Sequence, residues 1–421
     1  MPTAKSPVPA PLPEPAPVPG PDTEGRSVPG SGGRTPAPDA PAHWSAVVGV
    51  ALGIFTIVTS EILPIGMLTG LADDFGVSDG RAGLLMTLPG VLAALCAPLV
   101  AVAVGRVDRR IVLTVLMALL VLANLLTACA PAFWVALVAR ALVGLVIGGF
   151  WSIGAGLAPR LVPAASVATA TAVVFAAVPA GSVLGVPAGT LLGQHVGRRA
   201  AFVVLAALAL AVAVLLATAL PALPVGTVTR PRTLAALLRT RGVRAGLAVT
   251  GLVVVGHFAA YTYVTAFLRD TTHVDGTRIT VFLLLYGAAG VAGNFVAGAT
   301  LARGPRATFA VSAIGIAAAV LLFPVLGRSW PGAVGLLVVW GFAYGAVPAA
   351  SQTWFARSAP NAPEAAMVVF TSSFQATLAG GALLGGVVVD ATSASAVMVL
   401  SGVVCLATAA TVALSAGPKG D

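Results

Sequence analysis

Apolar runs of about twenty residues recur along this chain from Trp44 to Ala416, and each is long enough to cross a lipid bilayer as a helix. The chain is 58% hydrophobic and only 9% charged, whereas a soluble globular domain carries about 25% charged residues. A backbone embedded in lipid must satisfy its own hydrogen bonds, so runs of this length predict helices. The pattern therefore predicts an all-α integral membrane protein.

Charged residues and prolines divide the apolar sequence into twelve predicted spans. Their approximate bounds are residues 44–68, 82–104, 111–130, 133–157, 167–193, 200–220, 245–268, 279–302, 307–327, 332–355, 365–389 and 393–415. The longest loop between them contains five arginines and no acidic residue, and it separates six spans from six. We expect a disordered proline-rich tail, a first six-helix bundle, a basic linker, a second six-helix bundle and a short tail, at residues 1–42, 43–220, 221–244, 245–416 and 417–421.

The arginines indicate how the chain is oriented. Twelve fall in the connections on one side of the predicted membrane and six on the other, which places both termini in the cytoplasm of a cell-membrane protein. The net charge of +9 is spread over these short loops. It forms no basic patch interleaved with aromatic residues, so the sequence does not predict a nucleic-acid partner.

Weak internal symmetry joins the two groups of spans. The run Gly189-Thr-Leu-Leu-Gly193 is echoed 192 residues later by Gly381-Ala-Leu-Leu-Gly385. The glycines of spans four and ten, and the basic turns after spans two and eight, recur at nearly the same offset. A duplicated six-helix unit is the arrangement of many secondary transporters.

Glu61 is the only acidic residue inside a predicted span. A carboxylate at membrane depth is costly, so it usually lines a cavity, has a partner or binds a proton. Arg140 is the only basic residue deep in a span, and both residues are expected about 9–10 Å below the outer surface. We therefore expect Glu61 and Arg140 to interact in one transport state and to couple transport to protons. A static ion pair between spans one and four is the alternative.

Two glycine-rich motifs lie in spans four and five. Arg140-Ala-Leu-Val-Gly144-Leu-Val-Ile-Gly148 places its arginine and glycines near one helix face. Gly181-Ser-Val-Leu-Gly185-Val-Pro187-Ala-Gly189 predicts a thin, kinked helix surface. A basic turn, in which Gly105 and Arg106 are followed by Asp108, Arg109 and Arg110, joins spans two and three.

Together these three features resemble the major facilitator superfamily over residues 44–415. The resemblance implies twelve transmembrane helices in two pseudo-symmetric six-helix bundles, and the glycine-proline motif is typical of the antiporters of the family. The basic turn departs from the usual pattern, because Gly105 stands where the family has an acidic residue and an acid appears instead at Asp108. The gating ion pair credited to that acid is therefore in question here.

Finer resemblance points to the twelve-span drug:proton antiporters. Thr59-Ser60-Glu61-Ile-Leu-Pro64 is similar to their first span, and several stretches are most similar to purine ribonucleoside efflux permeases. These stretches are Asp108-Arg-Arg110, Gly148-Gly-Phe-Trp151, Arg160-Leu-Val-Pro163, Trp340-Gly-Phe, Val347-Pro348, Thr353-Trp354 and Gln375 ahead of Gly381. The resemblance implies proton-coupled export of small organic molecules, with purine ribonucleosides or their analogues as the leading substrates.

Substrate sites in such folds lie near the midplane between the halves, so polar and aromatic residues inside the spans are the candidates. A purine stacks on Trp or Tyr, and Gln375 can pair with its polar edge. The candidates are Phe150, Trp151, Phe258, Tyr261, Trp340, Tyr344 and Gln375, and Asn294 belongs to the same polar group. Helix packing accounts for any one of them equally simply. His257 is either a second proton carrier or a neutral packing residue.

The sequence contains no Walker loop, catalytic triad or metal-ligand spacing, so it predicts neither an enzyme nor a cofactor. We expect a single chain to work in the bilayer on a small molecule and protons. Drug or sugar export, or proton-driven import, are alternatives within the same class. A transporter-like sensor or assembly partner, docking through residues 1–42 and the arginine-rich loop, is the alternative of another class.

Overall fold

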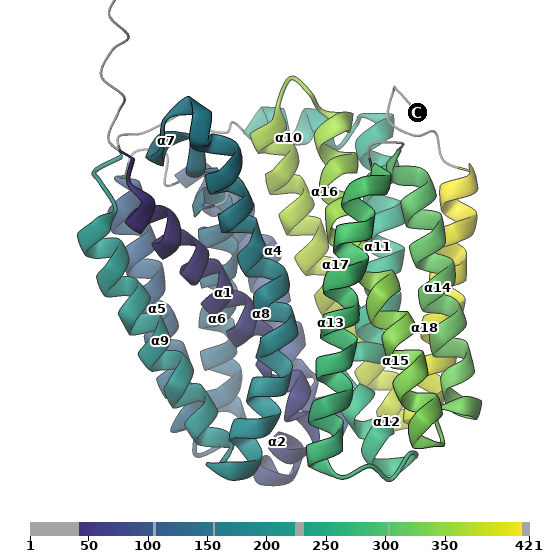
Figure 1. Cartoon of the computed structure of the whole chain (residues 1–421). Helices are drawn as coiled ribbons and strands as arrows, with labels where there is room; N and C mark the ends of the chain where they lie inside the picture. The colour runs from purple at the N-terminus through teal and green to yellow at the C-terminus, as the bar shows by residue number, and fades with distance from the viewer. Residues whose placement is uncertain (1–41, 104–106, 155, 224–230, 302–303, 415–421) are drawn as a thin grey trace, which may run out of the picture. The chain divides into compact units, whose positions relative to one another are not determined.

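The computed structural model describes residues 42–103, 107–154, 156–223, 231–301 and 304–414, all within one compact unit that spans residues 41–421. The proline-rich tail, Gly105 and Arg106 of the basic turn, and the C-terminal tail lie outside the described residues. Twelve stretches of the described residues are helices long and apolar enough to cross a membrane. This confirms the all-α membrane fold predicted from the sequence (Figure 1).

The first six spans run from α1 to α9. They are α1 (Trp44–Gly66), α3 with α4 (Asp79–Ala82, Leu84–Ala103), α5 (Arg109–Ala128), α6 (Phe133–Gly154), the 3-10 turn η2 with α8 (Ala164–Ser166, Val167–His195) and α9 (Arg198–Ala219). The last six are α11 with α12 (Arg241–Tyr261, Val264–Asp270), α13 (Gly276–Leu301), α14 (Pro305–Leu326), α15 with α16 (Trp330–Gly345, Val347–Ser358), α17 (Pro363–Ala391) and α18 (Ala394–Leu414). Short helices α2 (Leu68–Phe75), α7 (Ala158–Leu161) and α10 (Pro231–Leu237) lie in connections.

Two spans of the second half are broken where the sequence predicts a continuous helix. Thr262 ends α11, and its hydroxyl donates to the Phe258 carbonyl at 2.7 Å, which competes with the main-chain ladder. Pro348 lies in the first turn of α16 and cannot supply the N–H that would continue α15. The first break separates the cavity-lining part of α11 from α12, whereas residues on both sides of the second break line the cavity. The structure also begins α11 at Arg241, four residues before the expected bundle boundary, and places α10 inside the expected linker.

The same helix pairings occur in both halves. In the first half α1 packs on α8, α4 on α6 and α5 on α9, and in the second half α11 packs on α17, α13 on α15 and α14 on α18. The halves meet through α4 against α17 and through α8 against α13, which are equivalent contacts exchanged between the halves. This correspondence is what a duplicated six-helix unit requires.

Glycines let the paired helices approach closely. A Cβ on Gly144 of α6 would overlap the Pro89 carbonyl of α4, and a Cβ on Gly148 would lie 2.8 Å from the Ala93 carbonyl. The equivalent pair in the second half uses Gly341 of α15, where a Cβ would overlap a carbonyl of α13. The close approach of helices at small residues replaces hydrophobic burial as a source of packing energy in lipid.

The glycine-proline motif of α8 serves the same purpose against α1. A Cβ on Gly181 or Gly185 would lie 3.1–3.2 Å from main-chain atoms of α1, and a Cβ on Gly189 would lie 2.5 Å from Leu63. Pro187 is buried inside α8 and has no N–H for the helical hydrogen bond. The motif predicted from the sequence as a thin, kinked surface is thus the contact face of α8 on α1.

The two halves are joined at the end that carries α2 and α12 (Figure 1). Asp390 at the end of α17 accepts hydrogen bonds from the Ser78 hydroxyl at 2.6 Å and from the Gly80 N–H at 2.9 Å. Arg269 of the second half lies 3.5 Å from the Asp73 carboxylate and 3.8 Å from that of Asp79. These polar contacts hold the first half to the second at this end.

Asp74, next to Asp73 in sequence, behaves differently. Its carboxylate pairs with Arg198 at the start of α9, inside the first half. That hydrogen bond holds the pKa of the Asp74 carboxyl below its usual value. Asp74 therefore forms an ion pair within the first half, whereas Asp73 and Asp79 form ion pairs with Arg269 of the second half.

Candidate substrate and proton site

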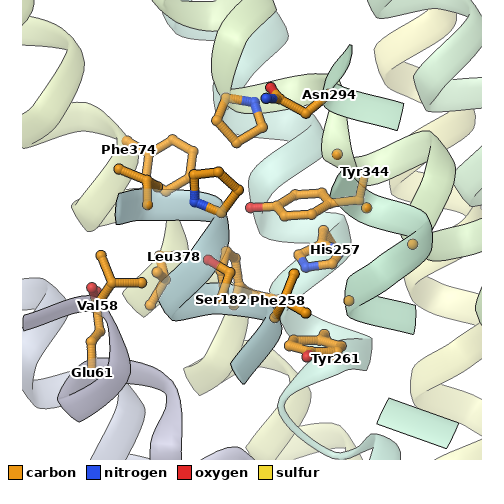
Figure 2. Close-up of a pocket in the computed structure, with 18 of the residues that line it drawn as sticks. Val58, Glu61, Ser182, His257, Phe258, Tyr261, Asn294, Tyr344, Phe374 and Leu378 are labelled. Carbon is orange, nitrogen blue, oxygen red and sulfur yellow. The ribbon is translucent and has the colours of Figure 1, made fainter. Parts of the chain in front are cut away.

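A cavity of about 210 Å³ lies between the halves. Its walls come from α1, α6 and α8 of the first half and from α11, α13, α15, α16 and α17 of the second. Figure 2 shows Val58 and Glu61 on one wall and His257, Tyr344 and Tyr261 on the facing wall. Asn294 of α13, labelled in Figure 2, and Gln352 of α16 also line the cavity. Glu61 and the candidate substrate residues lie in spans one, four, seven, ten and eleven, with Asn294 in span eight. The structure adds span five and further residues of span eight to the walls.

Glu61 brings a carboxylate into this cavity from α1. Its side chain is only 7% exposed, and its Oε1 accepts a hydrogen bond from Gln375 Nε2 at 2.9 Å. Gln375 lies on α17, so this bond joins the first half to the second in the middle of the protein. A buried carboxylate needs such a donor, because without one its desolvation is not compensated.

Arg140 lies beside Glu61 but binds main-chain oxygens. Its Nη1 and Nη2 donate to the carbonyls of Ser60 and Glu61 at 2.7 and 2.8 Å, and its Nε donates to the Leu85 carbonyl at 2.9 Å. The fully buried guanidinium thereby joins α6 to both α1 and α4. The described residues contain no ion pair between Arg140 and the Glu61 carboxylate, so a direct pairing of the two charges in another transport state stays a prediction.

Ser60 adds a second polar anchor for the same turn of α1. Its hydroxyl donates to Asn124 Oδ1 of α5 at 3.0 Å, and Asn124 in turn donates to the Leu120 carbonyl. Asn124, Ser60 and Arg140 are all buried. The turn of α1 that carries Glu61 is therefore held in place from α4, α5 and α6.

His257 is the centre of a buried aromatic cluster in the second half. Its ring is stacked on Tyr344 with ring centroids 3.4 Å apart, and its Nδ1 accepts a hydrogen bond from Trp340 Nε1 at 3.1 Å. An accepting Nδ1 carries no proton, which places the proton of the neutral ring on Nε2, 3.5 Å from the Tyr286 hydroxyl. This arrangement favours a neutral packing histidine, the second of the two roles expected from the sequence.

The predicted substrate residues divide into two groups. Trp151, Phe258, Tyr261, Tyr344 and Gln375 line the cavity, whereas Phe150 and Trp340 do not. Both of the latter are fully buried. The Phe150 ring lies against Gly53 and Gly154, where it fills the space left by the missing side chains. Trp340 lies behind His257 and supports it, so in this structure both residues pack the walls of the cavity.

Sequence reasoning missed several cavity residues, including three with polar groups. Tyr286 of α13, Ser182 of α8 and Gln352 of α16 all line the cavity. A tyrosine inside an otherwise apolar run was a usable signal for Tyr286. Ser182 follows Gly181 directly, and the interpretation of that motif as a packing surface concealed it. Gln352 lies near a span end in the sequence, and only the break between α15 and α16 brings it to the cavity.

The basic turn braces the first half. Asp108 caps α5 by accepting from the Arg110 N–H at 2.8 Å, and the same carboxylate oxygen lies 3.3 Å from the Leu223 N–H. Arg110 donates to the Ala217 carbonyl at the end of α9. Arg109 begins α5 and is partly buried. The contacts described for Asp108 and Arg110 therefore stay within the first half, and a gating role for the turn stays a prediction.

Among the described residues, no group of three or more His, Cys, Asp or Glu side chains is positioned to hold a metal ion. The chemistry that the site offers is one carboxylate with a crossing amide partner, facing a wall of aromatic rings. Such a site can bind a flat organic molecule and exchange a proton.

Comparison with known proteins agrees with this architecture. The family profile of the Major Facilitator Superfamily matches residues 50–364 and 247–420. The chain is 34% identical over 387 residues to the transcription regulatory protein OpdE of Pseudomonas aeruginosa PAO1, covering 91% of this chain and 96% of that protein. It is 31% identical over 371 residues to the purine ribonucleoside efflux pump NepI of Salmonella typhimurium LT2, covering 88% and 94%.

Solved structures share the fold. A bacterial homologue of the human lysosomal transporter Spinster, in an inward-facing and occupied conformation, aligns with a TM-score of 0.70 at 15% identity and covers 89% of this chain and 97% of that one. A human organic anion transporter aligns with a TM-score of 0.66 at 19% identity, covering 89% and 100%.

Proposed function

The chain belongs to the major facilitator superfamily of membrane transporters, and from this premise we propose that it exports small organic molecules in exchange for protons. One observation carries the proposal: Glu61 lines a cavity between the halves and hydrogen-bonds across it to Gln375. Intramembrane carboxylates usually mark ion or proton pathways. Glu61 is placed to exchange a proton while a substrate occupies the same cavity.

The arginine distribution supports a cytoplasmic location for the end that carries α7 and α10. The end that carries α2 and α12, where Asp390 and Arg269 join the halves, is then extracellular. In this orientation the described polar contacts between the halves lie at the extracellular end. We infer a state that is closed there and takes up its cargo from the cytoplasm, as an exporter must.

The chemistry of the cavity favours purine ribonucleosides or their analogues as substrates. Tyr344, Tyr261 and Trp151 supply flat aromatic surfaces, and Gln375, Asn294 and Ser182 supply hydrogen-bonding groups. Several relatives that are 31% identical are named purine ribonucleoside efflux pumps. Export of a drug or a sugar uses the same coupling, with a different fit to the cavity.

A regulatory function is the second candidate, because a relative that is 34% identical is named a transcription regulatory protein. In that case the chain senses a solute or docks a partner through its proline-rich tail and its arginine-rich linker. A sensor shows no net flux, and deletion of residues 1–42 abolishes its output. An exporter retains its flux after the same deletion.

The proposal is tested by proton movement in energised inside-out vesicles. Inosine, guanosine, and a panel of drugs and sugars are added while the lumenal pH is followed, with wild type and Glu61→Gln compared. Export is expected to release lumenal protons when a substrate is added to wild type, and Glu61→Gln is expected to lose this release. Unchanged pH dependence of transport in Glu61→Gln would rule out Glu61 as the coupling residue. Substrate binding without flux in wild type would favour the sensor.

A further inference from the structure

Gln375 carries a buried acceptor that lacks a donor. Its side chain is 4% exposed and lines the cavity, and its Nε2 donates to Glu61 Oε1 at 2.9 Å. Its amide oxygen, Oε1, has no hydrogen-bond partner among the described residues. Burying an acceptor without a donor is unfavourable. A donor is therefore expected to reach this oxygen in at least one state of the transport cycle.

The two protonation states of Glu61 treat this oxygen differently. An ionised carboxylate only accepts hydrogen bonds, so it can take the Gln375 N–H but has no hydrogen to donate to Gln375 Oε1. A protonated carboxyl has one O–H to donate as well. A carboxylic acid that already accepts from an amide N–H can donate its O–H to the oxygen of that same amide. Glu61 and Gln375 then form a ring of two hydrogen bonds, in which Gln375 Oε1 has a donor.

We propose that Gln375 Oε1 is an acceptor shared by the Glu61 proton and by an N–H or O–H donor of the substrate. The inference rests on the proposed function, in which Glu61 exchanges a proton. When Glu61 is ionised, Gln375 Oε1 is buried and unpaired. A hydrogen bond from a substrate donor to this oxygen then contributes its full favourable free energy to substrate binding. When Glu61 is protonated, the oxygen is already paired and the same donor adds little. Proton and substrate binding therefore oppose each other at this pair.

The neighbouring side chains do not supply a donor to Gln375 Oε1. From α6, Arg140 is engaged with main-chain carbonyls, and from α5, Asn124 is bonded to Ser60. His257 of α11 and Tyr344 of α15 line the facing wall of the cavity. In the contacts described, none of these groups donates to Gln375 Oε1. By linkage, a substrate that uses this oxygen lowers the proton affinity of Glu61 by the same factor by which the proton weakens the substrate.

The substrate class follows from this chemistry. A coupled substrate needs a flat ring for the aromatic wall and an N–H or O–H donor beside it for Gln375. Inosine offers such a donor at its ring N1, and 1-methylinosine has the same ring without it. The proposal therefore distinguishes two nearly identical molecules by a single hydrogen.

The first test reads the pair directly and needs no substrate. The chain contains only three glutamines, Gln194, Gln352 and Gln375, so protein labelled with ¹³C at the glutamine side-chain carbonyl gives a simple infrared spectrum. Acid-minus-alkaline difference spectra of the purified full chain should show a carboxylic-acid band that Glu61→Gln lacks. A glutamine carbonyl band should move to lower wavenumber with it, and Gln375→Met and Gln375→Leu should lack that band. Gln352→Met, altered at another cavity glutamine, should retain the shift.

The outcomes separate this inference from the proposed function. A Glu61 acid band without movement of the Gln375 band overturns the shared acceptor and leaves Glu61 as a proton carrier. Absence of both bands over the range of stability overturns the proton-carrying role itself, and this inference with it.

The second test measures binding of inosine and 1-methylinosine to wild type and Gln375→Met. Inosine should bind about tenfold more weakly to wild type at acidic than at alkaline pH. This ratio should fall towards one for 1-methylinosine and for Gln375→Met. An equal ratio for both nucleosides in wild type would exclude the ring N1–H as the donor, and an equal ratio for inosine in wild type and Gln375→Met would overturn the proposal. Failure of wild type to bind inosine would overturn the purine assignment, and the infrared result would still decide the pairing.

Discussion

Arg140 shows how one side chain can hold three helices. Its guanidinium donates to carbonyls on α1 and α4 from a fully buried position on α6. The planar fork of arginine offers these donors in fixed directions, which a lysine ammonium cannot reproduce. The residue therefore has a structural role in this state whatever its role in proton coupling.

We predict that Arg140→Lys destabilises the protein although it conserves the charge. Main-chain carbonyls of α1 or α4 lose their donors inside the protein, at a cost of about 2–4 kcal/mol. Thermal unfolding of the purified variant measures the loss. Arg239→Lys, at an exposed arginine, is the matched control. Equal unfolding temperatures for the two variants would show that the Arg140 hydrogen bonds to α1 and α4 do not stabilise the protein.

His257 and Glu61 share one cavity but differ in their surroundings. Glu61 has a donor suited to its ionised form, whereas His257 Nδ1 accepts from Trp340 and therefore suits a neutral ring. The distinction predicts which of the two residues sets the pH dependence of transport.

For His257→Asn we predict a transport pH profile like that of wild type. The Asn oxygen can replace Nδ1 as the acceptor for Trp340, and the loss of stacking on Tyr344 should raise KM by roughly 3- to 10-fold. Flux measured across a pH series checks both effects. A flattened pH profile in a variant that still transports would make His257 a proton carrier after all.

Helix pairs in this protein depend on glycines at defined positions. On α15, a Cβ added at Gly341 would overlap the Tyr286 carbonyl of α13, whereas a Cβ added at Gly335 would meet no atom within 4 Å. The two glycines belong to the same helix, so they separate the effect of helix propensity from that of close packing.

We predict that Gly341→Ala destabilises the protein by about 1–3 kcal/mol, because α13 and α15 must move apart. Gly335→Ala should be neutral or stabilising by about 0.5–1 kcal/mol, because alanine is the better helix former. Thermal unfolding of both variants gives the comparison. Similar unfolding temperatures for the two variants would mean that α13 and α15 can move apart without loss of stability. Because Tyr286 lines the cavity, Gly341→Ala should also weaken substrate binding.

The two halves repeat the same six-helix arrangement, and they contact each other through two equivalent helix pairs and through polar bonds at one end. α4 packs on α17 and α8 on α13, and the polar contacts of Asp390 and Arg269 close one end. The crossing contacts at that end combine these exposed polar bonds with a small buried apolar cluster that contains Leu68 and Tyr263. The polar bonds can be exchanged for others at modest cost when the halves rock.

We predict that Asp390→Ala opens the end that carries α2 and α12. Loss of the bonds from Ser78 and Gly80 removes about 1–3 kcal/mol from the closed state, which shifts a balanced two-state equilibrium by roughly 5- to 150-fold. Distances between spin labels at the exposed positions Arg199 and Arg328 report the opening. The control is Asp275→Ala, whose carboxylate pairs with Arg278 in its own half. An unchanged distance distribution in Asp390→Ala would show that other contacts hold this end.

The twelve spans, their division into two groups of six and the position of a carboxylate, Glu61, inside a span were readable from the chain, because they depend on local hydropathy and on the cost of a charge in lipid. The motif of span five was readable as a packing face for the same reason, since closely spaced glycines and a proline act along a single helix. The family followed from those motifs together.

The partners of the polar side chains were not readable, because each partner comes from a distant helix. Depth along the spans placed Arg140 near Glu61, but only the packing of α1, α4 and α6 directs the guanidinium to main-chain oxygens. Phe150 and Trp340 are aromatic residues inside spans, as several cavity-lining residues are. They lie on helix faces that do not line the cavity, and the sequence does not reveal these faces. The bond between Glu61 and Gln375 joins residues 314 positions apart. It exists because two similar halves face each other, a relation that hydropathy within either half does not encode.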